Sequence, residues 1–411
     1  MYFRYLYPQI IEALKDSPII LLHGPRQCGK TTLVKLIGEA EGIPYFTFDD
    51  DNLRASAQAD PVGFVLDLPE RAVIDEVQRV PELFTSLKAS IDNKRSPGRF
   101  ILTGSANVLL IPRLADSLAG RMEILRLFPL SQSEIRGAKS EFLTSLFKGN
   151  MGNMGTFEHK GSERLGKELA ERIVAGGFPA ALLRQSARRR ATWYRDYMET
   201  LIQRDIRDLA RISSLHVLPR LLAAVSGQTA GLINISELAA PFQISRPTIR
   251  EYVTLLTRIF LVEELNPWHS NRLKRLVKTP KLHMGDTGLA CALLGVSGDS
   301  LWDDRALFGR MLETFVFQEL RRQASWYDHH VEFSHFRDKD KVEVDIILEA
   351  EGKIAGIEVK ASSTVKMEDF KGLVKVRDCV QKKFAAGVVF YDGNTVVPFG
   401  DRLWGVPVST L

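Results

Sequence analysis

The sequence predicts a multidomain α/β protein, and three features of the chain lead to this prediction. Short apolar runs typical of buried parallel strands alternate with helix-like segments up to about residue 127. A glycine-rich loop joins one of these runs to a helix-like segment, as in nucleotide-binding α/β domains. At 411 residues the chain is also too long for one compact core, so two or three domains are expected.

The glycine-rich loop spans residues 24–31 and matches the pattern G-x-x-x-x-G-K-[ST] between the apolar run 19–22 and the helix-like run 31–40. Backbone N–H groups of such a loop, together with the helix N-terminus, hold phosphates. Lys30 is expected to reach the β- and γ-phosphates, and the Thr31 hydroxyl to hold Mg²⁺. The pattern predicts binding of ATP or GTP. The residues expected at the nucleotide are Gly24, Pro25, Arg26, Gln27, Cys28, Gly29, Lys30, Thr31 and Thr32.

A second apolar run, residues 72–76, ends in two carboxylates, Asp75 and Glu76. ATP hydrolysis requires one group that coordinates the metal ion and another that positions and deprotonates the attacking water. Asp75 is predicted to complete the Mg²⁺ shell, and Glu76 to orient and deprotonate the attacking water. A solvated acidic turn is the alternative for an isolated pair of this kind, but its place after a phosphate-binding loop favours the catalytic interpretation.

A third apolar run, residues 100–103, leads into small polar residues at the expected carboxyl end of a strand. Such residues lie beside the γ-phosphate in sheets of this type. Ser105 or Asn107 is predicted to sense that phosphate, and Thr103 is a weaker candidate.

Residues 23–130 contain G-P-R-Q-C-G-K-T-T, V-I-D-E-V-Q, L-T-G-S and L-A-G-R-M-E-I-L-R-L-F-P-L-S. This stretch resembles the AAA-like domain of a large group of prokaryotic ATPases, in which the ATPase core precedes a C-terminal domain first described as of unknown function. Further matching motifs at 176–179, 204–206 and 281–289 extend the resemblance over nearly the whole chain. The resemblance implies ATP and Mg²⁺ as cofactors.

Arg121 precedes the apolar run 123–127, where AAA-type ATPases carry an arginine finger that reaches a neighbouring subunit's nucleotide. If Arg121 has this role, the protein works as a homo-oligomer. An ordinary surface arginine is the alternative, because the sequence does not show where its side chain points.

The remaining chain divides at a Gly/Asn-rich segment, residues 148–155, which is typical of a linker. Apolar residues then recur at helical spacing from 165 to about 227, which resembles a helical lid. The expected domains are an ATPase core over 1–147, a linker and lid over 148–227, a winged helix over 228–285, and a nuclease-like domain over 286–411.

The predicted winged helix has one helix at 235–240, a turn at 242–244 and a second helix from Ser245. Arg246 and Arg250 are expected to point outward from the second helix, where they suit insertion into DNA. Wing strands are expected at 259–262 and 264–266. A basic run follows them and suits phosphate contacts, with Arg272, Lys274 and Arg275 as the predicted DNA-binding residues and Lys278 and Lys281 continuing the run. A protein-binding module or a spacer is the alternative.

The C-terminal region contains Asp345 in one strand-like run and Glu358 and Lys360 in the next, after Glu313 on a helix-like segment. This pattern resembles the PD-(D/E)xK nuclease core. The resemblance implies a divalent metal shared by Asp345 and Glu358, assistance from Glu313, and a Lys360 that positions water. An inactive nuclease-like module is the alternative.

Charge and composition favour a nucleic-acid partner over a membrane. The net charge is +5, and no run of residues is apolar enough to span a membrane, so a cytoplasmic location is expected. Three widely spaced cysteines and the histidines at 329, 330 and 335 match no disulfide framework or zinc spacing.

Taken together, these features predict an oligomeric ATPase that binds duplex or branched DNA and remodels or moves along it, with metal-dependent cleavage by the C-terminal domain as a further possibility. Two alternatives are kept. One is a signalling or defence switch in which ATP controls assembly with a protein partner. The other is a nucleotide-dependent DNA-binding regulator without cleavage.

Overall fold

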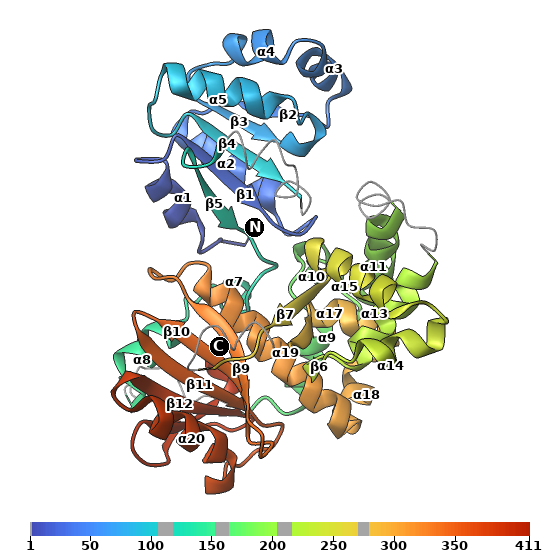
Figure 1. Cartoon of the computed structure of the whole chain (residues 1–411), viewed down its shortest axis with the longest axis vertical. Coiled ribbons are helices and arrows are strands. Elements are labelled where there is room, and N and C mark those ends of the chain that lie inside the picture. Colours follow the sequence, from blue (N-terminus) through green and yellow to red (C-terminus); the bar gives the residue numbers. More distant parts are fainter. Residues whose placement is uncertain (1, 106–117, 153–163, 204–215, 270–278) are drawn as a thin grey trace. The chain divides into compact units, whose positions relative to one another are not determined.

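The computed structural model describes residues 2–105, 118–152, 164–203, 216–269 and 279–411. The chain divides into two compact units (Figure 1). The first contains residues 1–130 with 178–180 and 258–260, and the second contains the rest. Helix α8 (Phe142–Lys148) packs on strands of the second unit, so the expected domain boundary at residue 147 lies inside that unit.

The first unit is built on a sheet of five parallel strands in the order β2-β3-β4-β1-β5. Helices connect the strands, because parallel neighbours require crossover connections. The strands are β1 (Ile19–His23), β2 (Tyr45–Thr47), β3 (Ala72–Asp75), β4 (Phe100–Gly104) and β5 (Met122–Arg126), and the helices are α1 (Tyr7–Ala13), α2 (Lys30–Glu41), α3 (Asp51–Ala59), α4 (Pro61–Asp67) and α5 (Leu83–Asn93).

The central strands β1, β3 and β4 are buried on both faces, which explains why they are apolar without alternation. Ile19 and Leu21 belong to a core formed with α3, α4 and α5. Ile20 and Leu22 point the other way, into a core formed with α1 and α2. The parallel strands therefore end at one edge of the sheet, where the polar residues that follow β1, β3 and β4 are brought together.

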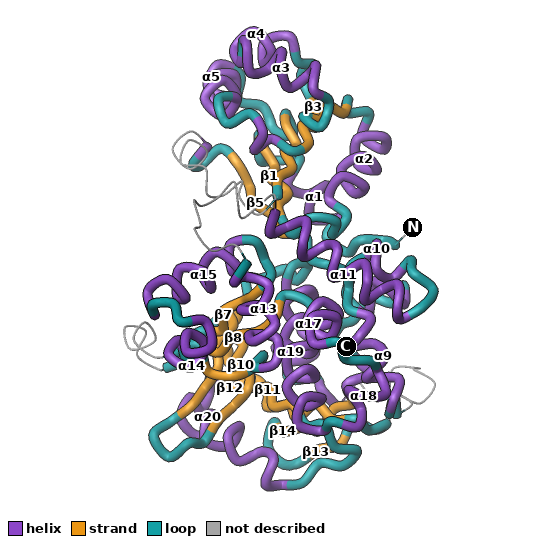
Figure 2. Tube along the Cα trace, turned by 90° about the vertical axis from the view of Figure 1, so that its right-hand side faces the viewer, coloured by secondary structure: helices purple, strands orange, loops and turns teal. Residues whose placement is uncertain are grey.

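The second unit contains most of the helices that follow (Figure 2). Its longest helix, α19, runs through the unit and carries mostly buried residues. The described helices after the first sheet are α7 (Gln132–Arg136), α8, α9 (Lys167–Ala175), α10 (Pro179–Leu182), α11 (Ala187–Leu201), α13 (Val217–Gly227), α14 (Ile235–Ala239), α15 (Arg246–Arg258), α17 (Thr287–Leu294), α18 (Gly298–Asp303), α19 (Arg305–Ala324) and α20 (Lys371–Val380).

Helices α13, α14 and α15 accompany a small antiparallel sheet in the order β6-β8-β7, in which β6 lies between α13 and α14 in the sequence and β7 and β8 follow α15. Its strands are β6 (Gly231–Leu232), β7 (Val262–Leu265) and β8 (Lys281–Met284). The two predicted wing strands were misplaced: 262–265 forms a single strand, and its antiparallel neighbour is 281–284. The apolar run 259–262 resembled a strand because Ile259, Leu261 and Val262 are all buried, although only Val262 belongs to one.

A six-stranded mixed sheet forms the last part of the chain, in the order β13-β14-β12-β11-β10-β9. Glu351 and Gly352 both have positive φ, which matches the two-residue turn between β10 and β11. Helix α20 and Trp268 cover one face with an apolar core. The strands are β9 (Glu332–Arg337), β10 (Glu343–Ala350), β11 (Lys353–Val359), β12 (Phe384–Tyr391), β13 (Val397–Pro398) and β14 (Leu403–Pro407).

None of the helices in the described part of the chain has the length and apolar character needed to cross a membrane.

Candidate functional site

The phosphate-binding loop connects the end of β1 to the start of α2. Gly24 and Gly29 both have positive φ, and Gly29 is the N-cap of α2. A Cβ on Gly24 would collide with the carbonyl oxygen of Leu127, so this position requires glycine. Pro25 and Cys28 are buried beneath the loop, whereas Gln27 and Thr32 are exposed and Arg26 is half-buried.

Lys30 is buried, and its ammonium group contacts the loop itself. Its Nζ donates hydrogen bonds to the carbonyl oxygens of Gly24 (2.9 Å) and Pro25 (2.8 Å). These two bonds hold the ammonium group over the loop, where a phosphate oxygen is expected to replace a carbonyl as its partner.

Arg4 supports the loop from the N-terminal segment, and the sequence analysis assigned it no role. Its guanidinium donates to the carbonyl oxygens of Cys28 (2.7 Å) and Phe128 (2.6 Å). The Cys28 thiol donates to the carbonyl of Leu127 at 3.4 Å. The sequence signal that could have indicated a buried partner is an arginine inside an otherwise apolar N-terminal segment.

Asp75 lies at the end of β3, and three hydroxyl groups donate hydrogen bonds to it. Its carboxylate accepts hydrogen bonds from Thr31 Oγ1 (2.9 Å), from Tyr45 (2.6 Å) and from Thr103. Burial, followed by the hydrogen bond to Asp75, raises the pKa of Tyr45. The oxygen ligands that Mg²⁺ prefers are thus adjacent at Thr31 and Asp75, so these residues fit the predicted metal.

Glu76 follows directly, with φ of 59° and ψ of 40°. Such backbone is uncommon for a residue other than glycine and occurs at functional sites. Thr103 Oγ1 accepts the Glu76 N–H at 3.2 Å, which helps to fix the turn. The Thr103 hydroxyl thus contacts both Asp75 and Glu76, so it helps to position these two residues.

Gln78 links two of the predicted residues and was itself missed. Its Nε2 donates to Glu76 Oε2 (2.5 Å) and to Ser105 Oγ (3.2 Å). Ser105 is therefore held beside the predicted catalytic carboxylate, at the end of β4. Asn107, the other sensor candidate, lies outside the described residues.

The end of β5 adds a cation to this edge of the sheet. Arg126 pairs in register with His23, directly before the phosphate-binding loop, and its guanidinium packs over the ring of Phe128. Burial, then the charges of Arg126 and Lys30, lower the pKa of His23 to about 3. His23 is therefore neutral at physiological pH, and the positive charges at and around the loop come from Lys30, Arg126, Arg4 and Arg26.

Arg121 lies at the opposite edge of the sheet, because it precedes β5 and β5 runs parallel to β1. Its guanidinium makes two hydrogen bonds to the Asp92 carboxylate of α5, at 2.6 and 3.0 Å. Both side chains are partly exposed. Arg121 therefore does not reach the loop of its own subunit.

Gly176 and Gly177 of the motif 176–179 meet the end of the motif 281–289 inside the second unit and have a structural role there. Asp286 accepts the Gly177 N–H (2.8 Å) and the Leu289 N–H (3.2 Å), and pairs with the buried Arg322 (3.2 Å). A Cβ on Gly176 would collide with Tyr194 and Asp286. The motif 204–206 lies outside the described residues.

The structure brings together Glu313 from α19, Asp345 from β10 and Glu358 from β11, as the sequence predicts, but around a lysine. Lys281 Nζ lies 2.9 Å from Glu313 Oε1 and 3.2 Å from Asp345 Oδ1. Lys360 pairs with Glu358 at 2.8 Å. The predicted metal shared by Asp345 and Glu358 does not fit this arrangement, and no group of three or more potential metal-ligating His, Cys, Asp or Glu residues occurs among the described residues.

Burial and neighbouring charges shift the pKa values of the carboxyl and ammonium groups in this cluster. Burial, then the charge of Asp345, raises the pKa of Glu313 and of Glu358 to about 8. Burial alone lowers the pKa of Lys281, but the charges of Asp345 and Glu313 outweigh it and raise that pKa. Lys281 therefore stays protonated, and it is not one of the exposed phosphate contacts predicted for the basic run.

The predicted helix from Ser245 is confirmed as α15. Ser245 Oγ accepts the Thr248 N–H at 3.3 Å, and Ile249 is buried. Arg246 and Arg250 are exposed on the other side, as predicted. Arg272, Lys274, Arg275 and Lys278 lie outside the described residues.

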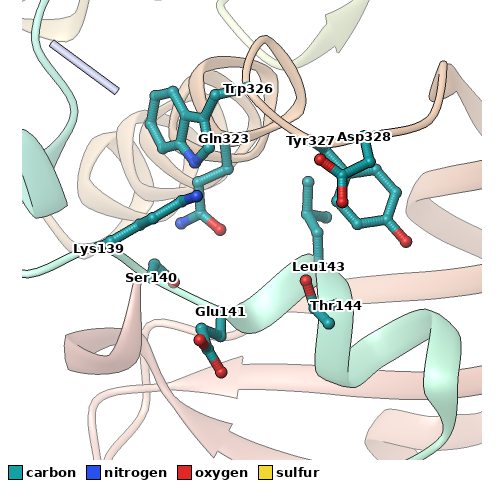
Figure 3. Close-up of a pocket in the computed structure, with 9 residues that line it drawn as sticks. All are labelled: Lys139, Ser140, Glu141, Leu143, Thr144, Gln323, Trp326, Tyr327 and Asp328. Carbon is teal, nitrogen blue, oxygen red and sulfur yellow. The ribbon is translucent and has the colours of Figure 1, made fainter. Parts of the chain in front are cut away.

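A shallow pocket lies between α8 and the end of α19 (Figure 3). Its lining includes Lys139, Thr144, Gln323 and Trp326. The pocket holds none of the residues predicted to act on nucleotide or DNA.

Residues 16–136 match a family model described as an AAA domain, which agrees with the loop, the carboxylates after β3 and the parallel sheet. The first unit is thus similar to this AAA family and has the parallel sheet and phosphate-binding loop of a P-loop ATPase-like core. Residues 166–300 and 308–411 match two families, each described as a domain of unknown function (DUF8612 and DUF4143).

Relatives extend over nearly the whole chain. An uncharacterized protein of Mycobacterium tuberculosis is 29% identical over 402 residues, which cover 97% of this chain and 82% of that protein. An uncharacterized protein of Haemophilus influenzae is 22% identical, with 97% of both chains covered.

Solved structures are similar at a looser level. The Walker-type ATPase PABY2304 of Pyrococcus abyssi is 16% identical, covers 71% of this chain and 96% of its own, and has a TM-score of 0.42. The RuvB Holliday junction branch migration motor of Thermotoga maritima is 18% identical, covers 63% and 88%, and has a TM-score of 0.28. Scores this low do not establish a shared overall fold.

Proposed function

We propose that the protein hydrolyses ATP and uses the hydrolysis to remodel DNA or move along it. The observation that supports hydrolysis is that Thr31, Asp75 and Glu76 lie close together at one edge of the sheet. Thr31 and Asp75 would hold Mg²⁺, which would neutralise charge on the β- and γ-phosphates. Glu76, oriented by Gln78, would take the proton from the attacking water.

Lys30→Ala should abolish detectable ATP binding, because it removes the one ammonium group that the loop holds by two carbonyl contacts. The measurement is titration of a fluorescent ATP analogue, together with phosphate release. Lys15→Ala is the matched control, since Lys15 is an exposed lysine of the same unit. Normal ATP affinity in Lys30→Ala would remove the loop from the proposed mechanism.

DNA binding is proposed from the order of elements in the second unit. Three helices (α13, α14, α15) and the antiparallel strands β7 and β8 follow the arrangement of a winged helix. Arg246 and Arg250 lie at the exposed start of α15, the end of a recognition helix that contacts DNA. In the sequence, the basic residues 272, 274 and 275 come between β7 and β8 and suit phosphate contacts.

Replacing Arg246 and Arg250 together by Ala should weaken duplex binding and flatten its salt dependence. The logarithm of the binding constant falls as the logarithm of the salt concentration rises, and each lost phosphate contact makes this slope shallower by about 0.9. The measurement is fluorescence anisotropy over a salt series, with Lys382→Ala/Lys383→Ala as a control that removes two exposed charges elsewhere. An unchanged slope in the arginine variant would show that α15 does not lie on the DNA backbone.

The order of α19, β9, β10, β11, α20 and β12 supports a PD-(D/E)xK nuclease-like fold for the last domain. Two of its carboxylates form ion pairs with lysines: Asp345 with Lys281 and Glu358 with Lys360. These ion pairs favour a domain that binds DNA or protein over one that cleaves DNA, so we do not include cleavage in the proposed function. The same observation favours, as a second candidate, an ATP-controlled switch whose C-terminal domains bind a protein partner or DNA. An ATPase rate that no DNA changes would favour this second candidate.

A further inference from the structure

The carboxylates of the nuclease-like domain are buried and close together. The side chains of Glu313 and Asp345 are 14% and 12% exposed. Carboxyl groups taken out of water in this way either take up a proton or pair with a counter-ion, since an unpaired buried charge is strongly destabilising. In a metal-dependent nuclease the counter-ion is a divalent cation.

Here the counter-ion is supplied by the chain. Lys281 is only 3% exposed, and its Nζ contacts Glu313 and Asp345 and lies 3.6 Å from Glu343. Its backbone is fixed on both sides, because β8 is the central strand of its sheet and Lys281 pairs with Leu232 on β6 and with Leu265 on β7. The ammonium group is thus carried by a paired strand and is not a mobile surface group.

Two of the other ligand atoms are also engaged, whereas Glu358 Oε2 is buried without a hydrogen-bond partner among the described residues. The second oxygen of Asp345 accepts the Val359 N–H at 3.0 Å, and Glu358 Oε1 accepts from Lys360 at 2.8 Å. Mg²⁺ requires oxygen ligands at about 2.0–2.1 Å. A divalent ion bound by Glu313 and Asp345 would therefore lie next to an ammonium group that holds the same oxygens, and the two cations would repel each other.

We infer that the ammonium group of Lys281 is the resident cation of this cluster, in the place where a PD-(D/E)xK nuclease holds its divalent metal. The ion pairs of the cluster then connect the β6-β8-β7 sheet to the β9–β11 part of the large sheet. The domain acts as a metal-independent binding module. This inference does not depend on ATP hydrolysis, which takes place in the other unit.

The experiment measures Mn²⁺ binding by electron paramagnetic resonance on the full chain without nucleotide. All variants carry Asp75→Asn, which removes the metal ligand of the P-loop site. With Lys281 intact, adding Asp345→Asn should not change the number of bound Mn²⁺ ions. Lys281→Met should gain one Mn²⁺, and Lys281→Met/Asp345→Asn should lose it again. Lys281→Arg keeps the charge and should gain none.

A Mn²⁺ ion that binds while Lys281 is intact and is lost in Asp345→Asn would overturn the inference. So would a folded Lys281→Met that gains no Mn²⁺. The first comparison leaves Lys281 unchanged, so it decides the question even if Lys281→Met does not fold. ATPase activity of the unmodified chain, measured separately, distinguishes failure of this inference from failure of the proposed function.

Discussion

Glu76→Gln should slow ATP hydrolysis by about 10²- to 10⁴-fold and leave ATP binding intact, because the amide cannot accept the proton of the attacking water. The amide retains the size of the side chain and an oxygen that accepts from Gln78, so the local structure is preserved. The measurement is phosphate release at saturating ATP, with affinity followed by a fluorescent ATP analogue.

The control for this variant is Glu39→Gln, which changes an exposed carboxylate of α2 in the same unit. It should turn over ATP at the rate of the unmodified protein. Turnover by Glu76→Gln at that same rate would mean that Glu76 is not the base, and the role assigned to the end of β3 would be wrong.

Arg121→Ala should reduce turnover by about 10³-fold or more with little change in ATP affinity, if Arg121 acts on the nucleotide of a neighbouring subunit. Its position supports action between subunits, because Arg121 and the phosphate-binding loop lie at opposite edges of one sheet. In the isolated chain Asp92 holds its guanidinium, so Asp92→Ala should not impair turnover as Arg121→Ala does.

Mixing Arg121→Ala with Lys30→Ala subunits should restore part of the activity, because each variant supplies the group that the other lacks. The measurement is phosphate release across a range of mixing ratios, with mass measured by light scattering under the same conditions. A strictly monomeric protein during turnover, or no recovery at any ratio, would rule out the finger.

The ATPase domain was largely predictable because its signals are local. The loop at 24–31, the strand that ends at Asp75 and the strand before Ser105 are each read from a few consecutive residues. The bounds of β1, β3 and β4 agree with the predicted runs within about one residue. Parallel strands that share one edge then bring the separate signals together.

The residues that were missed depend on contacts between distant parts of the chain. In the sequence, Lys281 looks like one more residue of the basic run that it ends. Only the pairing of β8 with β6 and β7 places it in the carboxylate cluster. Arg4 reaches Cys28 and Phe128 in the same way, across 24 and 124 residues. The contact between Arg121 and Asp92 likewise spans 29 residues. Spacing along the sequence does not encode such pairs.

The most direct test of the proposed function is the steady-state ATPase rate with and without single-stranded, duplex and branched DNA. Coupling of hydrolysis to DNA predicts a rate that rises severalfold with at least one of these DNAs. It also predicts that Arg246→Ala/Arg250→Ala loses this rise but keeps the rate measured without DNA. A rate that none of the three DNAs changes, at concentrations where the protein is bound to them, would contradict it.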